Sequence, residues 1–204
     1  MEQILIYIKH NLKILWRFIE WINEIIFLVW HNKRLDLILN EVYDEVHISD
    51  FIFRRINSLD LESLHNLLTT QGKGDLEYFN PHSFDIKTLK RYQKSHTFLM
   101  MGTFDRNKLV GYFFLRFFAN KKCFVGRLID TQYRGKGIGA MMNMIMYETS
   151  WRMGFRCLST ISRHNKNVIK AHAKNPNLVV LKEMSNDYLL VEFVKIVNSA
   201  VSER

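Results

Sequence analysis

"YRGKGIG", residues Tyr133–Gly139, places three glycines at alternate positions directly before "AMMNMIMYE", which has the composition of a helix. Glycine costs conformational entropy, so it is kept where the backbone needs a positive φ or where no side chain would fit. A strand that ends near Asp130 and a helix that starts near Gly137 would point the first helical amides at this turn, at the positive end of the helix dipole. Arg134 and Lys136 add positive charge. The stretch therefore predicts an anion site suited to a phosphate.

Three phosphate-binding designs compete for this geometry. A Walker loop is excluded because no Gly-x4-Gly-Lys-Ser/Thr spacing exists. A dinucleotide fingerprint fits Gly135, Gly137 and Ala140, but it needs an acidic residue about twenty positions later, and none occurs between Glu148 and Glu183. The stretch also follows a predicted β-meander instead of opening a parallel βαβ unit.

The third design is carried by two motifs. Gln132 to Gly137 resembles the Q/R-x-x-G-x-G/A pyrophosphate loop of the GNAT acetyltransferase superfamily, and Asn165 with His172 is similar to its second signature, an Asn followed after six residues by Tyr or His. The family's following Lys-Gly-Phe is replaced by residues 174–177, which leaves the end of that helix open. The resemblance runs from about His47 to Val197. It implies an α/β (α+β) fold with a mixed, largely antiparallel central sheet flanked by helices.

The resemblance also implies a chemistry, the direct transfer of an acetyl group from acetyl-CoA to a primary amine without an acyl-enzyme. In that scheme the strand before the loop splays, and its backbone amides face the acetyl carbonyl. The residues that it assigns to the cofactor are Leu128, Ile129, Gln132, Tyr133, Arg134, Gly135, Lys136, Gly137, Ile138, Gly139, Ala140 and Asn165.

Three residues are candidates for proton transfer. Asp130, at the end of the splayed strand, could poise the amine, or it could simply be a turn residue. His82 lies in the predicted loop 71–85 that would cover the acceptor cleft, where Tyr78, Phe79 and Phe84 could wall it; the alternative is an exposed loop histidine. His172 could return a proton to sulfur, or it could be a polar residue on a helix surface. The acceptor is expected to be a small-molecule amine, and an amino sugar is one hypothesis.

Hydrophobic periodicity and turn residues predict the element order beyond residue 45. Helices are expected at 58–70, capped by Ser58, and at 86–95, 137–153 and 165–174. Strands are expected at 46–56, 97–104, 109–118, 123–130, 155–162, 177–183 and 187–197. The predicted divisions are an N-terminal amphipathic helical extension (1–45), an acetyltransferase domain (46–198) and a C-terminal tail (199–204).

The first thirty residues contain an apolar stripe at helical spacing, formed by Ile4, Ile8, Leu12, Leu15, Ile19, Ile22, Ile26 and Val29. The longest uncharged apolar run, Ile25–Trp30, is too short for a bilayer span, and no signal peptide is expected. One interpretation is a helix packed on its own core or in a homodimer interface. The other is a peripheral membrane anchor, supported by Trp16, Trp21 and Trp30.

Charge and cysteine usage narrow the partners. The net charge is +9, yet residues 1–45 carry five basic and seven acidic side chains, so the excess lies in the rest of the chain. No nucleic-acid motif accompanies it, so a polyanionic small molecule is the better partner and nucleic acid is not expected. Cys123 and Cys157 are expected as buried thiols of a reducing compartment, the cytoplasm, and no metal site is predicted. Two rival functions stay open, a non-catalytic acyl-CoA-binding regulatory module and a peripheral membrane protein.

Overall fold

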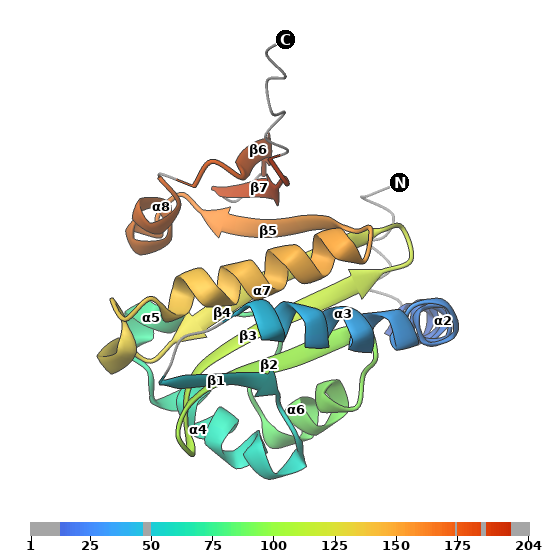
Figure 1. Cartoon of the computed structure of the whole chain (residues 1–204), viewed down its shortest axis with the longest axis horizontal. Coiled ribbons are helices and arrows are strands. Elements are labelled where there is room, and N and C mark those ends of the chain that lie inside the picture. The colour runs from blue at the N-terminus through green and yellow to red at the C-terminus, as the bar shows by residue number, and fades with distance from the viewer. Residues whose placement is uncertain (1–12, 47–49, 174, 185–186, 197–204) are drawn as a thin grey trace.

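One seven-stranded sheet organises the chain, in the order β1-β2-β3-β4-β5-β7-β6 (Figure 1). The structure, a computed structural model, describes residues 13–46, 50–173, 175–184 and 187–196. All neighbouring strands are antiparallel except β4 and β5. The strands are β1 (Phe51–Arg55), β2 (Phe98–Asp105), β3 (Lys108–Phe118), β4 (Lys122–Ile129), β5 (Arg156–Ser162), β6 (Leu178–Glu183) and β7 (Tyr188–Phe193).

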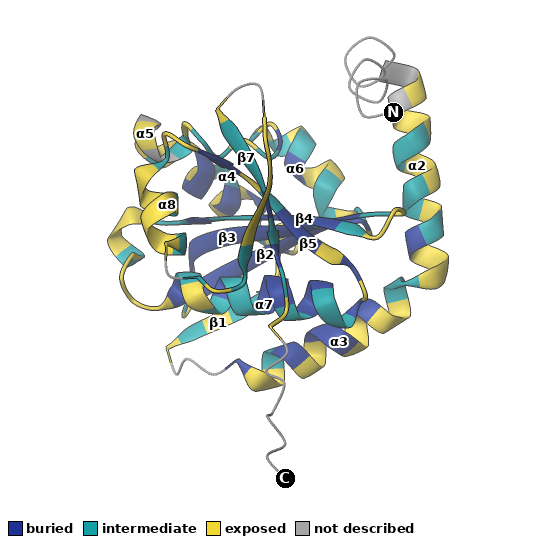
Figure 2. Cartoon of the chain, turned by 90° about the horizontal axis from the view of Figure 1, so that it is seen from above, coloured by how far each residue is buried: buried dark blue, intermediate teal, exposed yellow. Residues whose placement is uncertain are grey.

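Helices cover both faces of the sheet. They are α2 (Lys13–Trp30), α3 (Asn32–Glu45), α4 (Leu61–Thr70), α5 (Lys73–Leu76), α6 (Ile86–Gln93), α7 (Ile138–Arg152) and α8 (Lys166–His172), with 3-10 turns η1 (Ser58–Asp60) and η2 (Thr131–Tyr133). Figure 2 shows α3 and α7 on one side of the sheet and α4 and α6 on the other. The predicted fold class is confirmed, and the predicted strands and helices occur in the predicted order, but the predicted loop 71–85 also contains the short helix α5. The first helix after β1 is capped by Asn57, not by Ser58, because the Asn57 side chain accepts from the Leu59 amide at 2.8 Å.

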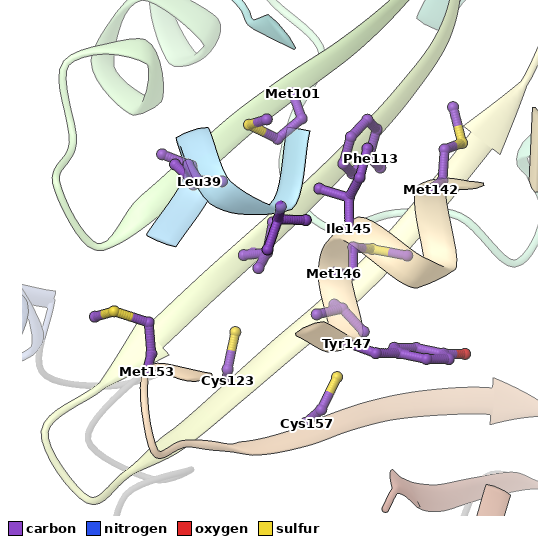
Figure 3. Close-up of a cluster of buried hydrophobic side chains, with 14 of the residues drawn as sticks. Leu39, Met101, Phe113, Cys123, Met142, Ile145, Met146, Tyr147, Met153 and Cys157 are labelled. Atoms are coloured by element: carbon purple, nitrogen blue, oxygen red, sulfur yellow. The ribbon is translucent and has the colours of Figure 1, made fainter. Parts of the chain in front are cut away.

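The larger core lies between the sheet and the helices α3 and α7. Met101 and Phe113 from the sheet meet Leu39 of α3 and Met142 and Ile145 of α7 there (Figure 3). Both cysteines are free and buried, as predicted, and they are direct register partners on β4 and β5.

Helix α3 belongs to this main core, although it lies within the predicted extension. Its Leu35, Ile38, Leu39 and Val42 are buried, and ion pairs join Arg152 of α7 to Glu45 at 2.6 Å. Residues 32–45 are therefore part of the folded domain and not an independent appendage.

Helix α2 packs on the sheet through Phe27, which is buried in the larger core and stacks on Phe117, and through polar side chains. Asn23 Nδ2 donates to Phe117 O at 3.0 Å and Asn23 Oδ1 accepts from Ala119 N at 2.6 Å, while Glu24 accepts from Thr97 Oγ1 at 2.7 Å. Leu15, Ile22 and Val29 of the predicted apolar stripe are exposed. The expectation that this stripe packs on the core is thus wrong for these members, and Ile4, Ile8 and Leu12 lie outside the described residues.

None of the helices in the described residues has the length and apolar character needed to cross a bilayer. No cluster of three His, Cys, Asp or Glu side chains within the same residues could hold a metal ion.

Candidate functional site

Strands β4 and β5 are paired at one end and separate at the other. Lys122, Cys123 and Phe124 pair with Arg156, Cys157 and Leu158. One residue further on, Ser159 Oγ donates to Val125 O at 2.9 Å, so a side chain replaces the backbone bond. No register pair joins the strands beyond this point in the described part of the chain, and the residues of β4 from Gly126 to Ile129 border a gap.

The direction of the β4 amides follows from the strand's alternation. Arg156 N donates to Lys121 O at 2.8 Å on the β5 side, whereas Asp130 N donates to Val110 O at 2.9 Å on the β3 side. Odd-numbered residues of β4 therefore present their backbone groups to β5. The amide of Ile129 faces the gap as expected, but the amide of Leu128 faces β3. The second backbone amide that faces the gap is that of Arg127.

The three glycines of the opening stretch serve two purposes. Gly135 and Gly137 have φ values of +78° and +82°, which L side chains rarely adopt, and Gly137 is the N-cap of α7. Gly139 is different, because a Cβ there would lie 3.0 Å from Arg127 Nη1 and 3.2 Å from Ile129 Cδ1. Two glycines make the turn, and the third lets the first turn of α7 approach β4.

The start of α7 has the features of an anion site. Ala140 N and Met141 N both donate to Gly137 O, and in the described residues no hydrogen bond uses the amides of residues 135–139. The first turn contains no acidic residue. Lys136 Nζ lies 4.5 Å from the centre of the Tyr133 ring, so a cation stands beside these amides and the helix dipole.

The other residues of the predicted loop follow the turn. Gln132, Arg134 and Ala140 are exposed, and Ile138 is buried under the loop. Asn165 lies elsewhere, as the N-cap of α8, and its Oδ1 accepts from Val168 N at 3.1 Å. Its local role is therefore to start α8.

Asp130 holds the turn between β4 and the glycines. Its Oδ1 accepts from Gln132 N at 3.0 Å, and its Oδ2 lies 4.0 Å from Lys108 Nζ. A carboxylate with these two partners is a cap of η2, which matches the turn alternative considered for it.

His82 is not beside the gap. It is buried in a second, smaller core, which lies between the sheet and the helices α4 and α6. Its Nε2 lies 2.8 Å from Tyr112 Oη and its Nδ1 lies 2.9 Å from Ser83 O, while Phe84 and Phe98 pack edge-on against the ring. Burial lowers the pKa of the imidazole. Because both ring nitrogens are already bonded, the geometry favours a structural role for His82.

His172 lies at the end of α8, half-buried against Phe193. Asn175 Nδ2 lies 3.1 Å from His172 Nδ1 and 3.4 Å from Tyr147 Oη, so the three side chains form one cluster. Burial, and then the charge of Arg127, lower the pKa of His172 to about 4. The imidazole is therefore neutral at pH 7.

Arg127 is a site residue that the sequence interpretation missed. Its Nε donates to Asn143 Oδ1 at 2.8 Å, and burial lowers the pKa of the guanidinium. Among the described residues it has no carboxylate partner, although most of its side chain is buried. A signal for it existed, because Cys123, Val125 and Ile129 share its side of β4 and are all apolar.

The opposite side of the gap is covered by the predicted acceptor loop. Phe79 lies against β4, since a Cβ on Gly126 would be 3.6 Å from its ring, and Thr131 Oγ1 donates to Gln71 Oε1 at 3.3 Å. A hydrogen bond to the Glu77 carboxylate, together with a contribution from Tyr188 of β7, raises the pKa of Tyr78. This loop therefore borders the gap, while its His82 points into the core behind it.

Comparison with known proteins gives matches by structure and not by sequence. No family model and no curated protein sequence matches the chain. The PaiA N-acetyltransferase of Thermoplasma acidophilum in complex with coenzyme A has a TM-score of 0.62 at 18% identity, over 71% of this chain and 99% of that one. The GNAT domain of PAT from S. lividans has 0.60 at 13%, over 69% and 88%. A ribosomal-protein-S5-alanine acetyltransferase from Vibrio fischeri has 0.58 at 18%, over 73% and 95%.

These matches and the separated strands β4 and β5 assign the chain to the class of acetyltransferase-like folds. The chain therefore has the fold of these acetyltransferases, and the fold that the resemblance implied is confirmed.

Proposed function

We propose that the protein is an N-acetyltransferase that uses acetyl-CoA and transfers the acetyl group directly to a primary amine of a small molecule. The observation that carries the proposal is the gap between β4 and β5, which opens beside a glycine turn with unpaired amides. A long cofactor with an anionic end needs a channel for its chain, which the gap would supply, and an anion site beside it, which the glycine turn would supply. The bound coenzyme A in the Thermoplasma protein supports this choice of co-substrate.

The chain's contribution to the reaction is mostly backbone. The amides of residues 135–139 and the dipole of α7 would bind the diphosphate, with Arg134 and Lys136 adding charge. The amides of Arg127 and Ile129 would stabilise negative charge on the acetyl oxygen as the amine attacks. Loss of one such donor costs about 100-fold to 1,000-fold in rate, so the width of the gap matters more than side-chain identity.

Proton transfer places different demands on the three predicted residues. Asp130 and His82 would have to give up hydrogen bonds that they already make before either could take a proton from the amine. His172, neutral at pH 7, serves better as a hydrogen-bond partner of Asn175 than as an acid. We therefore propose that water in the gap carries the proton from the amine, with Glu77 of the acceptor loop as a carboxylate that could receive it.

The acceptor is proposed from the lining of the loop side. The Glu77 carboxylate beside Tyr78 suits an ammonium group, and Phe79 offers an apolar wall. An amino sugar stays the first compound to test. The similar structures bear names with different acceptors, among them a ribosomal-protein alanine and phosphinothricin, so a panel needs peptides and amino acids as well.

The first experiment is thermal unfolding of the full chain with acetyl-CoA, NAD or ATP. A ligand at one hundred times its dissociation constant stabilises the folded state by about 2.7 kcal/mol. Acetyl-CoA should raise the melting temperature, whereas NAD and ATP should not. No shift with acetyl-CoA would remove the proposal.

The second experiment measures thiol release from acetyl-CoA with each amine of the panel. Turnover with an amine supports the enzyme. Binding of acetyl-CoA without turnover on any amine would support the regulatory-module alternative instead.

A further inference from the structure

The outer face of α2, formed by Leu15, Phe18, Trp21, Ile22, Ile25, Leu28 and Val29, is apolar and turned to solvent. Trp21 is 58% exposed and Val29 is 70% exposed, and Trp30 at the end of the helix is 73% exposed. A helix on a protein surface normally buries its apolar side. Figure 2 shows α2 at the edge of the molecule, where nothing in the described chain covers this face.

The acidic side chains of α2 are bonded to residues of the sheet and of the segment that precedes β2. Glu20 pairs with Arg116 at 3.0 Å, and the Glu24 carboxylate accepts from Ser95, Thr97 and the His96 amide. Both described carboxylates of the helix are therefore engaged on the protein side. The outer face is left without negative charge.

A cavity of about 740 Å³ continues the outer face between α2, α6 and the β3–β4 turn. Trp21 and Ile22 belong to both surfaces, and Phe98, Phe118 and Phe124 extend the apolar lining to the sheet. Arg91, Lys94 and Lys122 stand on the cavity wall. The apolar surface is thus larger than the helix alone and has cations along its margin.

More cations surround the helix itself. Arg17 is exposed and lies four residues before Trp21, so both are on the same side of α2. At the other end, Lys121 Nζ lies 3.1 Å from His31 Nε2. An apolar helix face with exposed tryptophans and a cationic margin is the combination that binds in the headgroup region of an anionic bilayer.

A second copy of the chain fits this surface less well. Two-fold pairing of the outer faces would bring two copies of the same cationic margin, with Arg17, Lys94 and Lys122, into one interface. Glu20 and Glu24 also line the cavity, but Glu20 is paired with Arg116 and Glu24 accepts hydrogen bonds from Ser95 and Thr97. Charge complementarity therefore favours a negatively charged lipid surface over a dimer.

We propose that the outer face of α2 and the adjoining cavity bind the surface of an anionic lipid bilayer, with α2 lying in the plane of the interface. The acetyl-transfer gap lies elsewhere on the sheet, so this proposal is independent of the proposed function.

The test is flotation of the full chain with vesicles of phosphatidylcholine mixed with phosphatidylglycerol, beside vesicles of phosphatidylcholine alone. The chain should float with the mixed vesicles, and its tryptophan emission should shift to the blue. The double variant Trp21→Ser/Ile25→Ser should lower the partition coefficient by about 30-fold or more, because two large apolar side chains lose their burial. The matched control is Leu37→Ser/Ile52→Ser, two residues of α3 and β1 that are 65% and 55% exposed, and it should bind like the parent.

A variant with fewer positive charges measures the electrostatic contribution to vesicle binding. Lys94→Gln/Lys122→Gln should weaken binding to the mixed vesicles by about fivefold for each lysine removed, and added salt should reduce this difference. Circular dichroism and melting of every variant check that each one folds.

Three results would overturn the proposal. One is equal flotation with the two kinds of vesicle, and another is unchanged flotation of Trp21→Ser/Ile25→Ser. The third is a concentration-dependent dimer in sedimentation, dissolved by that same variant, with no vesicle binding, which would assign the face to a second copy of the chain.

Discussion

The two ends of α7 are built for different tasks. At its start, Gly137 caps the helix in a left-handed conformation, no side chain bonds the first amides, and a gap lies alongside. At its end, Arg152 pairs with Glu45 and Glu148, and Met153 is buried before Gly154, whose φ of +76° ends the helix. A helix end with its polar groups satisfied adds stability, whereas an end with its amides left open is available to a ligand.

The strongest test of this contrast uses the two left-handed glycines. Gly135 (φ +78°) and Gly154 (φ +76°) would each meet nothing within 4 Å on gaining a Cβ, so Gly135→Asp and Gly154→Asp carry similar backbone strain. A carboxylate about 5 Å from the bound diphosphate should cost about 3 kcal/mol, or about 100-fold in acetyl-CoA affinity. Calorimetric titration should show this loss for Gly135→Asp alone. Equal affinities would place the anion site elsewhere.

Met153→Ala tests the stabilising end of the helix. Met153 is 1% exposed, and truncation of a buried methionine to alanine costs about 2–5 kcal/mol. Denaturant unfolding should show this loss in the free energy of unfolding, with acetyl-CoA affinity unchanged in the folded protein. A matching fall in affinity would mean that the two ends are coupled.

The cluster of His172, Asn175 and Tyr147, which lies beside α7, makes the free energy of unfolding depend on pH. The pKa of His172 falls from 6.5 to about 4 on folding, so the unfolded chain binds more protons between these values. The contribution of His172 is complete above pH 6.5 and is lost as the pH falls toward 4, by about 2 kcal/mol. Unfolding measured from pH 7 to pH 4 should show a smaller slope for His172→Gln than for the parent chain. Other groups whose pKa is lowered on folding, among them His82 and Asp60, contribute to the slope that stays.

The smallest effect is expected for Arg152→Ala. Its ion pairs join α7 to Glu45 of α3, but Glu45 is half exposed, so water screens the pair and the loss should be about 1 kcal/mol. Unfolding at low and high salt should give a smaller difference from the parent at high salt. A loss that salt does not change would point to packing of the arginine stem instead.

Local signals in the sequence were sufficient for the element order. Alternation, helical spacing and turn residues placed every strand from Phe98 to Phe193 and the start of α7. The glycine turn was predictable for the same reason, because glycine is the usual residue wherever the backbone needs a positive φ. The sequence predicts Ser58 as the cap, whereas the structure has Asn57, because the exact first residue of a helix depends on the final backbone.

Features set by distant residues were not predictable in this way. Glu24 meets Ser95 and Thr97, more than seventy positions away, and these bonds turn the polar side of α2 inward. His82 is buried because Tyr112 lies thirty positions further on. The direction of the Leu128 amide depends on the register with β3, which the sequence of β4 does not contain.

The bond between Ser159 Oγ and Val125 O bears on the size of the group that can be transferred. A hydroxyl that rotates away at a cost of about 1 kcal/mol would lengthen the opening between β4 and β5 by one residue pair without breaking the backbone ladder. In the proposed acetyltransferase, rotation of this one serine torsion would leave room for acyl groups longer than acetyl.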